Sequence, residues 1–438
     1  MNLNTLKAIR HQVYGCFERG ADALLELADA LSSEAGVRSL PQWSLSPAFR
    51  RKWPSLYEAL EDGQINQRRW SEVWTAALLP EQHGPIWISV DSTSIARPEA
   101  ETSPDRGMIY VPNLPHAKRP VSVGWQFSTV MLLPATRSSW GALLTQRRIK
   151  SGETAIAVAI DQLEHLRSLL PAGTRVLADR WYATGPCVAA CQRLQMPALV
   201  RLKRNRKLYR QAPPPIVGKR GAPRKDGELF QGSKPETWGE ADASWHGSDE
   251  QGQPIGVQAW QHLHFRQARD VELTVYRVLR PAAKGSRRDP RESWFVWVEA
   301  GSLPLEEVVA CYQHRFSHEH TYRFLKQDLL WTKVHVRTPQ QFERWSLLVA
   351  TAQNQLVLAR SFGQASYRPW ERRRQVVTPR QVRRVMPAIL QQLGTPAGVP
   401  KPRGKSPGWP KGTPRRRPTR FEVIKKPKPE PQRSRKRA

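Results

Sequence analysis

Apolar residues recur at helical spacing through the first part of the chain. Leu24, Leu27 and Leu31 fall on one face of a helix, and a second run of this kind begins near Leu56. Polar and charged residues occupy most of the positions between them. The pattern predicts a small helical domain over residues 1–80.

Beyond Pro85 the pattern changes to short apolar runs of the kind that form buried strands. Helical patterns separate some of these runs, at 154–170 and again after Gly185. Strands that alternate with helices predict an α/β fold, with the first part of its core over residues 81–204. The predicted strands are Ile86–Asp91, Phe127–Leu133, Arg175–Asp179 and Ala198–Leu202.

Residues 205–291 break this alternation. They open with a stretch rich in Pro, Gly and charge and continue with strand-like runs such as VELTVYRVL at 271–279. The segment is predicted to be a β-rich insertion. Helical patterns return at about 303–330 and 339–361, and these two helices are expected to complete the core over residues 292–362.

The chain carries a formal net charge of +31, with a pI near 10.7. This excess of Lys and Arg goes far beyond what solubility needs and indicates a polyanionic partner, for which nucleic acid fits best. No apolar run reaches about 18 residues and no export-type start is present, so neither membrane insertion nor secretion is supported. Four scattered cysteines without a CxxC pair fit a reducing cytoplasm.

The C-terminal segment is the most basic part of the chain. From Lys401 on, it holds fifteen Lys or Arg against two Glu, interleaved with prolines. With almost no large apolar residues it cannot build a core. We expect residues 363–438 to form a flexible tail that binds DNA by counterion release, the alternative being a tail that only keeps the protein soluble.

Two other polar clusters have more ordinary interpretations. The basic cluster FRRKW (Phe49–Trp53) could touch DNA phosphates, which would make residues 1–80 a DNA-binding domain, or it could be a solvated loop. Asp105 and Arg106 lie in the turn-like segment TSPDR, and a turn role is favoured over catalysis.

Two aspartates, Asp91 and Asp179, lie at or just beyond the carboxyl ends of predicted buried strands. This is where α/β sheets usually present reactive groups. Aspartates at strand ends also often cap the following turn, so that either residue alone is a weak indication of a site.

A third acidic residue lies in the segment CYQHRFSHEHTYRFLKQDLLW. On one continuous helix, Tyr312, Arg315, Glu319 and Lys326 would fall within about a 60° sector of the surface. Arg315 and Lys326 would then be placed to hold phosphates, and Tyr312 could hydrogen-bond or stack. The alternative is a solvated helix face with incidental ion pairs.

A cluster of Asp91, Asp179 and Glu319 would require a cation, because three carboxylates brought together repel one another. Hard oxygen ligands suit Mg²⁺ or Mn²⁺. Two such ions, about 4 Å apart, can activate an attacking water and stabilise a leaving 3′ oxygen.

The spacing Tyr312-x2-Arg315-x3-Glu319-x6-Lys326 resembles the Tyr-Arg-Glu-Lys signature of a large group of bacterial insertion-sequence DDE transposases. All four positions match. The context is similar too, with VDSTSIARPEAETSPDRGMIYV around the first Asp, ADRWYATG around the second, and RFLKQDLLW after the Glu. The resemblance extends over roughly residues 15–425.

The resemblance implies an RNase H-like core in which Asp91, Asp179 and Glu319 are the catalytic residues and the ligands of the metal ions. It implies that the β-rich insertion interrupts this core, with the helical domain before it and the basic tail after it. The expected partners are double-stranded DNA, as transposon ends and as target, and a second copy of the chain in a homodimer on DNA. The expected location is the bacterial cytoplasm, at the nucleoid.

In relatives of this kind the insertion can hold a DNA hairpin by stacking an aromatic ring on a flipped base. Trp294 and Trp297 are the nearest candidates. Three residues apart on a strand, they should face opposite sides of the sheet, so that one of them is expected to be exposed. Plain packing is favoured for both, since Trp commonly fills cores.

Three functions fit these observations. The first is an active transposase that cuts transposon ends by metal-dependent hydrolysis and transfers the strands into target DNA. The second is a DNA-binding derivative that keeps the shape without the chemistry, against which the intact carboxylates argue. The third is a metal-dependent nuclease without strand transfer, which the same fold would support equally well.

Overall fold

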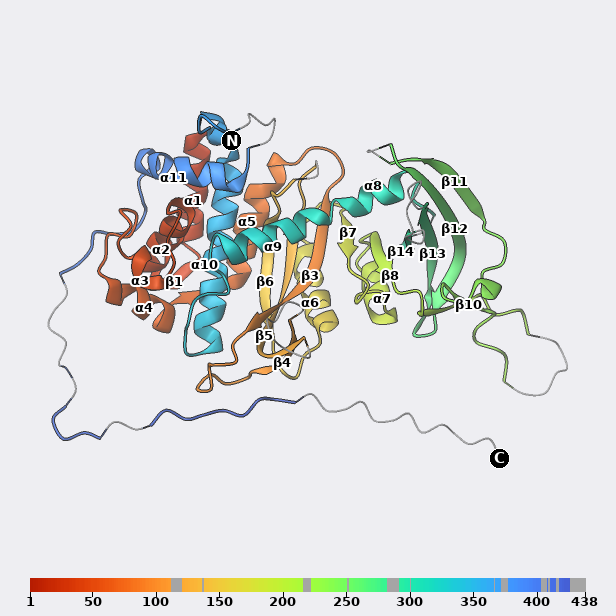
Figure 1. Ribbon diagram of the computed structural model, residues 1–438, viewed down its shortest axis with the longest axis horizontal. Coiled ribbons are helices and arrows are strands. Elements are labelled where there is room, and N and C mark those ends of the chain that lie inside the picture. Colours follow the sequence, from red (N-terminus) through yellow and green to blue (C-terminus); the bar gives the residue numbers. More distant parts are fainter. Residues whose placement is uncertain are drawn as a thin grey trace.

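Helix α10 (Pro339–Leu358) stands between a layer of N-terminal helices and a large β-sheet (Figure 1). Nearly all of its residues are buried, as a helix enclosed on two sides requires. The computed structural model describes the chain apart from residues 112–119, 136–137, 216–221, 250–251, 282–290, 300, 366, 372–376, 403–407, 409, 415–416 and 426–438.

The helices predicted for the first 80 residues are confirmed, and they pack directly on α10. Trp43 lies against Trp345 with ring centroids 5.4 Å apart, and the Trp70 indole donates a hydrogen bond to Thr351 at 2.9 Å. The N-terminal helices therefore share one hydrophobic core with the rest of the molecule. They are α1 (Leu3–Tyr14), α2 (Ala21–Ser33), α3 (Leu40–Trp43), α4 (Trp53–Asp62) and α5 (Gln67–Leu78), with the short strands β1 (Phe17–Arg19) and β2 (Gln64–Ile65) and the 3₁₀ turn η1 (Leu79–Glu81).

Strands of the remaining chain join into one mixed sheet, of twelve strands among the described residues. Its first part runs β8-β7-β3-β5-β4, with β6 beside β5. The pairs β3–β7 and β7–β8 are parallel and the others are antiparallel. These strands are β3 (Trp87–Ala96), β4 (Gly107–Tyr110), β5 (Val121–Leu132), β6 (Ala142–Ile149), β7 (Arg175–Ala178) and β8 (Ala198–Leu202).

The four predicted strands are confirmed, but the expectation that the first ends at Asp91 is wrong. β3 continues to Ala96 because its antiparallel pairing with β5 extends to Ala96 opposite Gly124. Only the parallel pairing with β7 stops earlier, at Val90 opposite Ala178.

The segment predicted to be β-rich extends the same sheet. It contains β9 (Lys207–Arg210), β10 (Leu229–Gln231), β11 (Ala243–Ser248), β12 (Pro254–Phe265) and β13 (Ala268–Arg280), with the short turn η2 (Pro235–Thr237). β14 (Arg291–Val298) coincides with the strand-like run SWFVWVEA, just beyond the predicted β-rich segment, and it pairs with both β13 and β8. That this segment is an insertion that interrupts the core stays a prediction.

The helix expected from 303 to 330 is divided into α8 (Glu307–Gln313) and α9 (Phe316–Gln327). At the junction the amide groups of Arg315, Ser317 and His318 bond to carbonyl oxygens three residues back. Such tight turns end the regular α-helical pattern, and the expectation of one continuous helix is therefore wrong. The other helices are α6 (Ala155–Arg167), α7 (Gly185–Arg193), η3 (Ala359–Ala365) and α11 (Pro379–Leu393).

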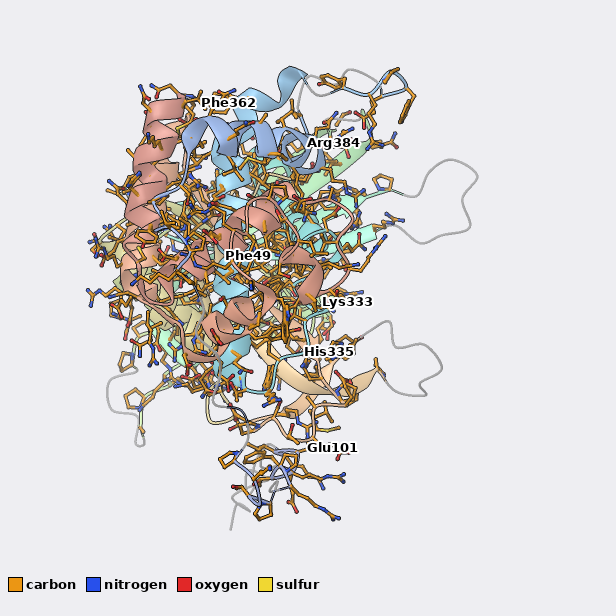
Figure 2. The ribbon with its side chains drawn as sticks, turned by 90° about the vertical axis from the view of Figure 1, so that its left-hand side faces the viewer. Phe49, Glu101, Lys333, His335, Phe362 and Arg384 are labelled. Carbon is orange, nitrogen blue, oxygen red and sulfur yellow. The ribbon has the colours of Figure 1, made fainter. Side chains whose placement is uncertain are left out.

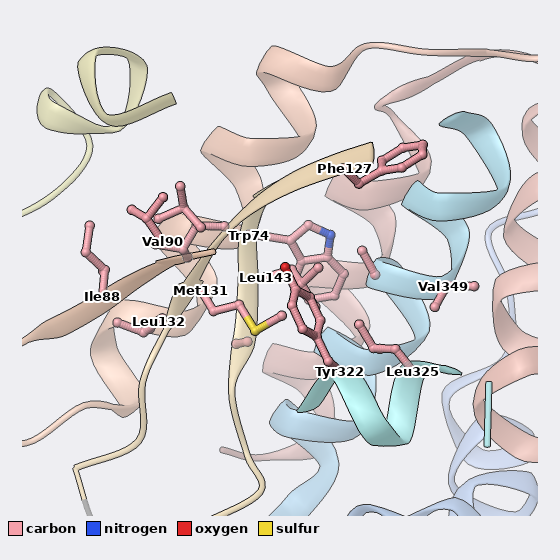
Figure 3. Packing of buried hydrophobic residues seen from close by; sticks show 14 of the residues in the cluster. Trp74, Ile88, Val90, Phe127, Met131, Leu132, Leu143, Tyr322, Leu325 and Val349 are labelled. Atoms are coloured by element: carbon pink, nitrogen blue, oxygen red, sulfur yellow. The ribbon is translucent and has the colours of Figure 1, made fainter. Parts of the chain in front are cut away.

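The core between the sheet and helices α9 and α10 is apolar and closely packed (Figure 3). Val90 and Met131 of the sheet lie on one side of it, Tyr322 and Leu325 of α9 on another, and Val349 of α10 behind them. A second cluster fills the opposite sheet face, where Trp297 packs with residues of α8. Both faces of the central strands are therefore covered.

Several charged clusters have structural roles. Arg50 and Arg51 of FRRKW pair with the buried Glu26 and donate to the carbonyl of Gly398, so these two guanidinium groups are engaged within the protein. Figure 2 shows Phe49 in the middle of this helical face. Asp105, at φ 55°, occupies a turn, as favoured from the sequence.

The prediction that residues 363–438 form a flexible tail is wrong for α11, whose Val382 and Met386 are buried in the main core because its apolar residues share one helix face. A later part of the C-terminal segment returns to the sheet. The Phe421 amide donates to the carbonyl of Glu101, the Ile424 amide donates to that of Arg106, and Ile424 forms a bridge with Gly107 beside β4. Glu101 lies at the lower end of the molecule in Figure 2. In the described part of the chain, no helix has the length and apolar character needed to cross a bilayer.

Trp294 and Trp297 face opposite sides of the sheet, but the expectation that one is exposed is wrong. Their exposed fractions are 1% and 2%. Trp294 lies in an aromatic cluster with Trp260, at 5.7 Å between centroids, and with Trp238, at 5.1 Å. Both rings therefore serve packing in this structure.

We predict that Trp294→Ala destabilises the protein by about 3 kcal/mol or more, since it empties the centre of an aromatic cluster. Trp294→Phe should lower the free energy of unfolding by about half as much or less, because part of the ring volume is kept. Chemical denaturation in urea measures both. Trp370→Ala, at a site 75% exposed, is the control and should change little. An undiminished urea midpoint for Trp294→Ala would contradict the packing role.

Candidate active site

Asp91 and Asp179 are placed side by side by the register of two parallel strands. Val90 of β3 pairs with Ala178 of β7, and each aspartate is the next residue of its chain. Asp179 caps its turn, accepting a hydrogen bond from the Arg180 amide at 2.5 Å. Asp91 accepts one from the Ser92 amide at 2.8 Å.

Glu319 joins this pair from α9 through one guanidinium group. Arg315 donates from Nη2 to Asp91 Oδ2 at 2.7 Å and from Nη1 to Glu319 Oε1 at 2.6 Å. Asp91 and Arg315 are largely buried, whereas about half of the Glu319 side chain is exposed. The three residues therefore form one ionic cluster at the boundary between protein and solvent.

A buried polar ladder fixes α9 on the sheet beside this cluster. The His318 ring lies 2.5 Å from Ser89 Oγ and 3.0 Å from Thr129 Oγ1. Thr129 Oγ1 also lies 2.6 Å from the Tyr322 hydroxyl, which donates to the carbonyl of Asp91 at 3.3 Å. Complete burial and the nearby Arg315 lower the pKa of His318, so this ring is neutral. These hydrogen bonds fix the position of α9, and with it Glu319, relative to strands β3 and β5.

Lys326 and Tyr312 flank the cluster from its two ends. The Lys326 ammonium donates to Thr93 Oγ1 at 2.5 Å, and burial lowers its pKa. The Tyr312 ring packs on Phe295 at 4.7 Å. Its hydroxyl is buried and has no hydrogen-bond partner within the described parts of the chain. All four residues of the predicted stripe thus meet near the aspartates, although the helix that carries them is broken.

The surroundings of Asp91 disfavour its ionised form. Burial raises the pKa of Asp91 to about 6, and Asp179 and Glu319 add to the rise, against the opposing effect of Arg315. Burial also raises the pKa of Tyr312 to about 12, so that its phenol stays protonated. Additional positive charge near Asp91 would relieve the repulsion.

The carboxylates offer the donors that a divalent cation prefers, but they do not form a complete cage. Among the residues that the structure describes, no three Asp, Glu, His or Cys side chains are arranged so that they could hold a metal ion. The Arg315 guanidinium instead bridges Asp91 and Glu319. A cationic side chain therefore already lies between two of the three carboxylates, the type of donor that Mg²⁺ and Mn²⁺ prefer.

Sequence reasoning missed Trp181, two residues after Asp179. Its ring is 61% exposed, and the Lys203 ammonium lies 3.1 Å from the ring centroid. It also missed the ladder of His318 and Tyr322. The signal for His318 was its position directly before Glu319, with Tyr322 one turn later.

Comparison with known proteins identifies a family for this chain. A family model described as DDE superfamily endonuclease matches residues 12–268, more than half of the chain. The matched part includes Asp91 and Asp179 and ends before Glu319. No curated protein matches the sequence.

We predict that Asp91→Asn stabilises the metal-free protein at neutral pH. The pKa of Asp91 is higher in the folded chain, about 6, than its ordinary value of 3.8, so ionisation of this group opposes folding. Wild type should therefore lose stability relative to Asp91→Asn as the pH rises through about 6, by as much as about 3 kcal/mol. Melting temperatures in EDTA between pH 4 and 8 measure the difference.

Asp105→Asn is the control, since hydrogen bonds from Ser151 and Arg148 outweigh partial burial and lower the pKa of Asp105. Its ionised form stabilises the fold above the ordinary pKa and is lost only in stronger acid. Asp105→Asn should therefore be less stable than wild type by the same amount at every pH from 5 to 8. Parallel pH profiles for wild type and Asp91→Asn would show that Asp91 titrates in its ordinary range.

Proposed function

Because the chain belongs to the DDE superfamily endonucleases, we propose that it is a DNA transposase that cuts transposon ends and transfers the strands into target DNA. The observation that carries this proposal is the ionic cluster of Asp91, Arg315 and Glu319 beside Asp179. The family implies an RNase H-like fold, with which parallel strands presenting two aspartates are consistent. The net charge of +31 supports DNA as the partner.

Each residue of the cluster has a task that its position supports. Asp91, Asp179 and Glu319 would hold two Mg²⁺ or Mn²⁺ ions, and such ions supply the activation of water and the stabilisation of the leaving oxygen. Arg315, once released from the carboxylates, would bind the scissile phosphate through a bidentate fork. Lys326 would hold a neighbouring phosphate, and the buried phenol of Tyr312 could donate its proton in a hydrogen bond to the DNA.

Two narrower functions remain in competition with strand transfer. A metal-dependent nuclease would cut the same DNA ends and release them. A DNA-binding derivative would bind them without cutting. We favour a cutting enzyme over the derivative because all four signature residues gather at the aspartates, an arrangement that DNA binding alone does not require. The resemblance to insertion-sequence transposases is the reason for preferring strand transfer to cutting alone. The homodimer, the insertion-sequence origin and the location at the nucleoid belong to the same proposal.

We predict that Asp91→Ala, Asp179→Ala and Glu319→Ala each lower the rate of Mg²⁺-dependent cleavage by at least about a thousand-fold, since the metal chemistry is lost. Binding to the same DNA should stay within about three-fold, because the basic surface is unchanged. The substrate is DNA bearing the end of the flanking element, cut with Mg²⁺, with Mn²⁺ and with EDTA.

Asp161→Ala is the matched control, because this exposed carboxylate pairs with Arg147 on the surface. It should cut at the wild-type rate. Full cleavage by any one triad variant would refute the assignment of that residue. Cleavage without joining to a target plasmid would favour the nuclease, and tight binding without cutting in either metal would favour the derivative.

We also predict that deleting residues 426–438 flattens the salt dependence of DNA binding. The deletion removes six Lys or Arg and spares the segment that docks beside β4. The slope of log K against log salt should fall in magnitude by as much as about 5, since fewer counterions are released. A Gly/Ser replacement of equal length is the control for chain length and should behave like the deletion. An unchanged slope would show that residues 426–438 do not bind DNA and only keep the protein soluble.

A further inference from the structure

The loops that follow β7 and β8 expose an aromatic ring next to a candidate catalytic carboxylate. Trp181 lies two residues beyond Asp179, and its side chain is 61% exposed although Trp is among the most favourable residues to bury. The Lys203 ammonium, from the loop after β8, covers one face of the indole at 3.1 Å. The exposure leaves room for a planar group to contact the ring as well.

A groove of about 380 Å³ is lined by the residues that follow these two loops, beginning with Ala183, two residues after Trp181. Thr184 and Gly185 form one wall, directly after the Trp181 loop, and Arg206 and Lys207 form another, directly after Lys203. Tyr209 and Arg266 also line the groove and make a second aromatic and cation pair, 4.6 Å apart. Two rings, each with a cation against its face, therefore lie in or beside this groove.

The charge of this path is positive. Partial burial, Arg206 and Arg180 lower the pKa of Lys203, which shows how closely the cations are gathered. The carboxylate nearest the far end, Asp226, is already paired with Arg269, Arg266 and His264. The acidic group at the near end is Asp179 itself, where the chemistry is proposed.

Aromatic rings with cations beside them fit unpaired nucleotides. The face of an exposed ring can stack on a base only if that base is not already stacked in a duplex, and the cations between the rings suit the phosphates. A duplex offers its phosphates to the same cations but hides its base faces. The geometry therefore distinguishes single-stranded from double-stranded DNA.

We propose that Trp181 and the groove beside it, lined by Arg206 and Tyr209, bind unpaired nucleotides of the DNA strand being cut, with Trp181 stacking on the base beside the scissile phosphate. The proposal rests on the proposed function for the identity of the strand. Trp181 is then a positioning residue for cleavage and a contact for single strands. Trp294, which is buried, is not required for this contact.

The test compares single-stranded and duplex DNA of one sequence, each labelled with a fluorophore, by anisotropy with the full chain in EDTA. Trp181→Ala should weaken single-strand binding about ten-fold and duplex binding less than about two-fold. Trp181→Phe, which keeps a ring, should restore most of the loss. Trp370→Ala is the matched control, since Trp370 is 75% exposed and has Arg368 over its ring at 5.6 Å.

Equal weakening of both DNAs by Trp181→Ala, or no weakening of the single strand, would overturn the proposal. An equal loss of single-strand binding with Trp370→Ala would overturn the proposal too, because any exposed indole would then bind single strands. None of these measurements needs cleavage. If the wild-type protein cuts no DNA but Trp181→Ala weakens single-strand binding, the transposase is refuted and the single-strand site is supported. If the protein cuts DNA and Trp181→Ala leaves single-strand binding unchanged, the single-strand site is refuted and the transposase is supported.

Discussion

The contact of Arg315 with Asp91 and Glu319 joins the two parts of the molecule that form the site. Asp91 belongs to the sheet and Glu319 to α9, and one guanidinium reaches both, at 2.7 and 2.6 Å. Three neighbouring carboxylates would otherwise repel one another, and burial already favours the neutral form of Asp91. Arg315 thus takes the electrostatic place that metal ions would take. Binding of a metal and release of this arginine toward a phosphate would be one coupled event.

The strands could be predicted because buried strands leave periodic signals. The three carboxylates were singled out by strand-end positions and by the family resemblance, and their catalytic role stays a prediction. It could not predict the register of β3 against β7, which depends on pairing between segments far apart in the chain and which brings Asp91 beside Asp179. The break before α9 was also missed, since 100° per residue assumes an uninterrupted helix. The side chains converge nonetheless because the ladder through His318 fixes α9 on the sheet.

Exposure was the least predictable property of the site. Trp294 and Trp181 are the same residue type, yet one is 1% exposed and the other 61%. Trp294 of β14 packs against Trp260 of β12 and Trp238 at the end of η2, so its ring completes a cluster formed by residues distant in sequence. Trp181 lies on a loop at a sheet edge where no such neighbours enclose it. Local sequence patterns carry no direct record of either environment, and a prediction of base stacking therefore needs the fold.

The net charge of +31 likewise says less than the position of each cation. Several arginines are used inside the protein: Arg50 and Arg51 pair with Glu26, and Arg106 donates to four loop carbonyls. These groups hold the fold together and have little left for a phosphate. Lys203, beside Trp181, has a different environment, because its ammonium contacts an aromatic face in place of a carboxylate. Affinity for DNA should therefore depend on a few placed lysines and arginines near Asp179 and on the tail, more than on the total charge.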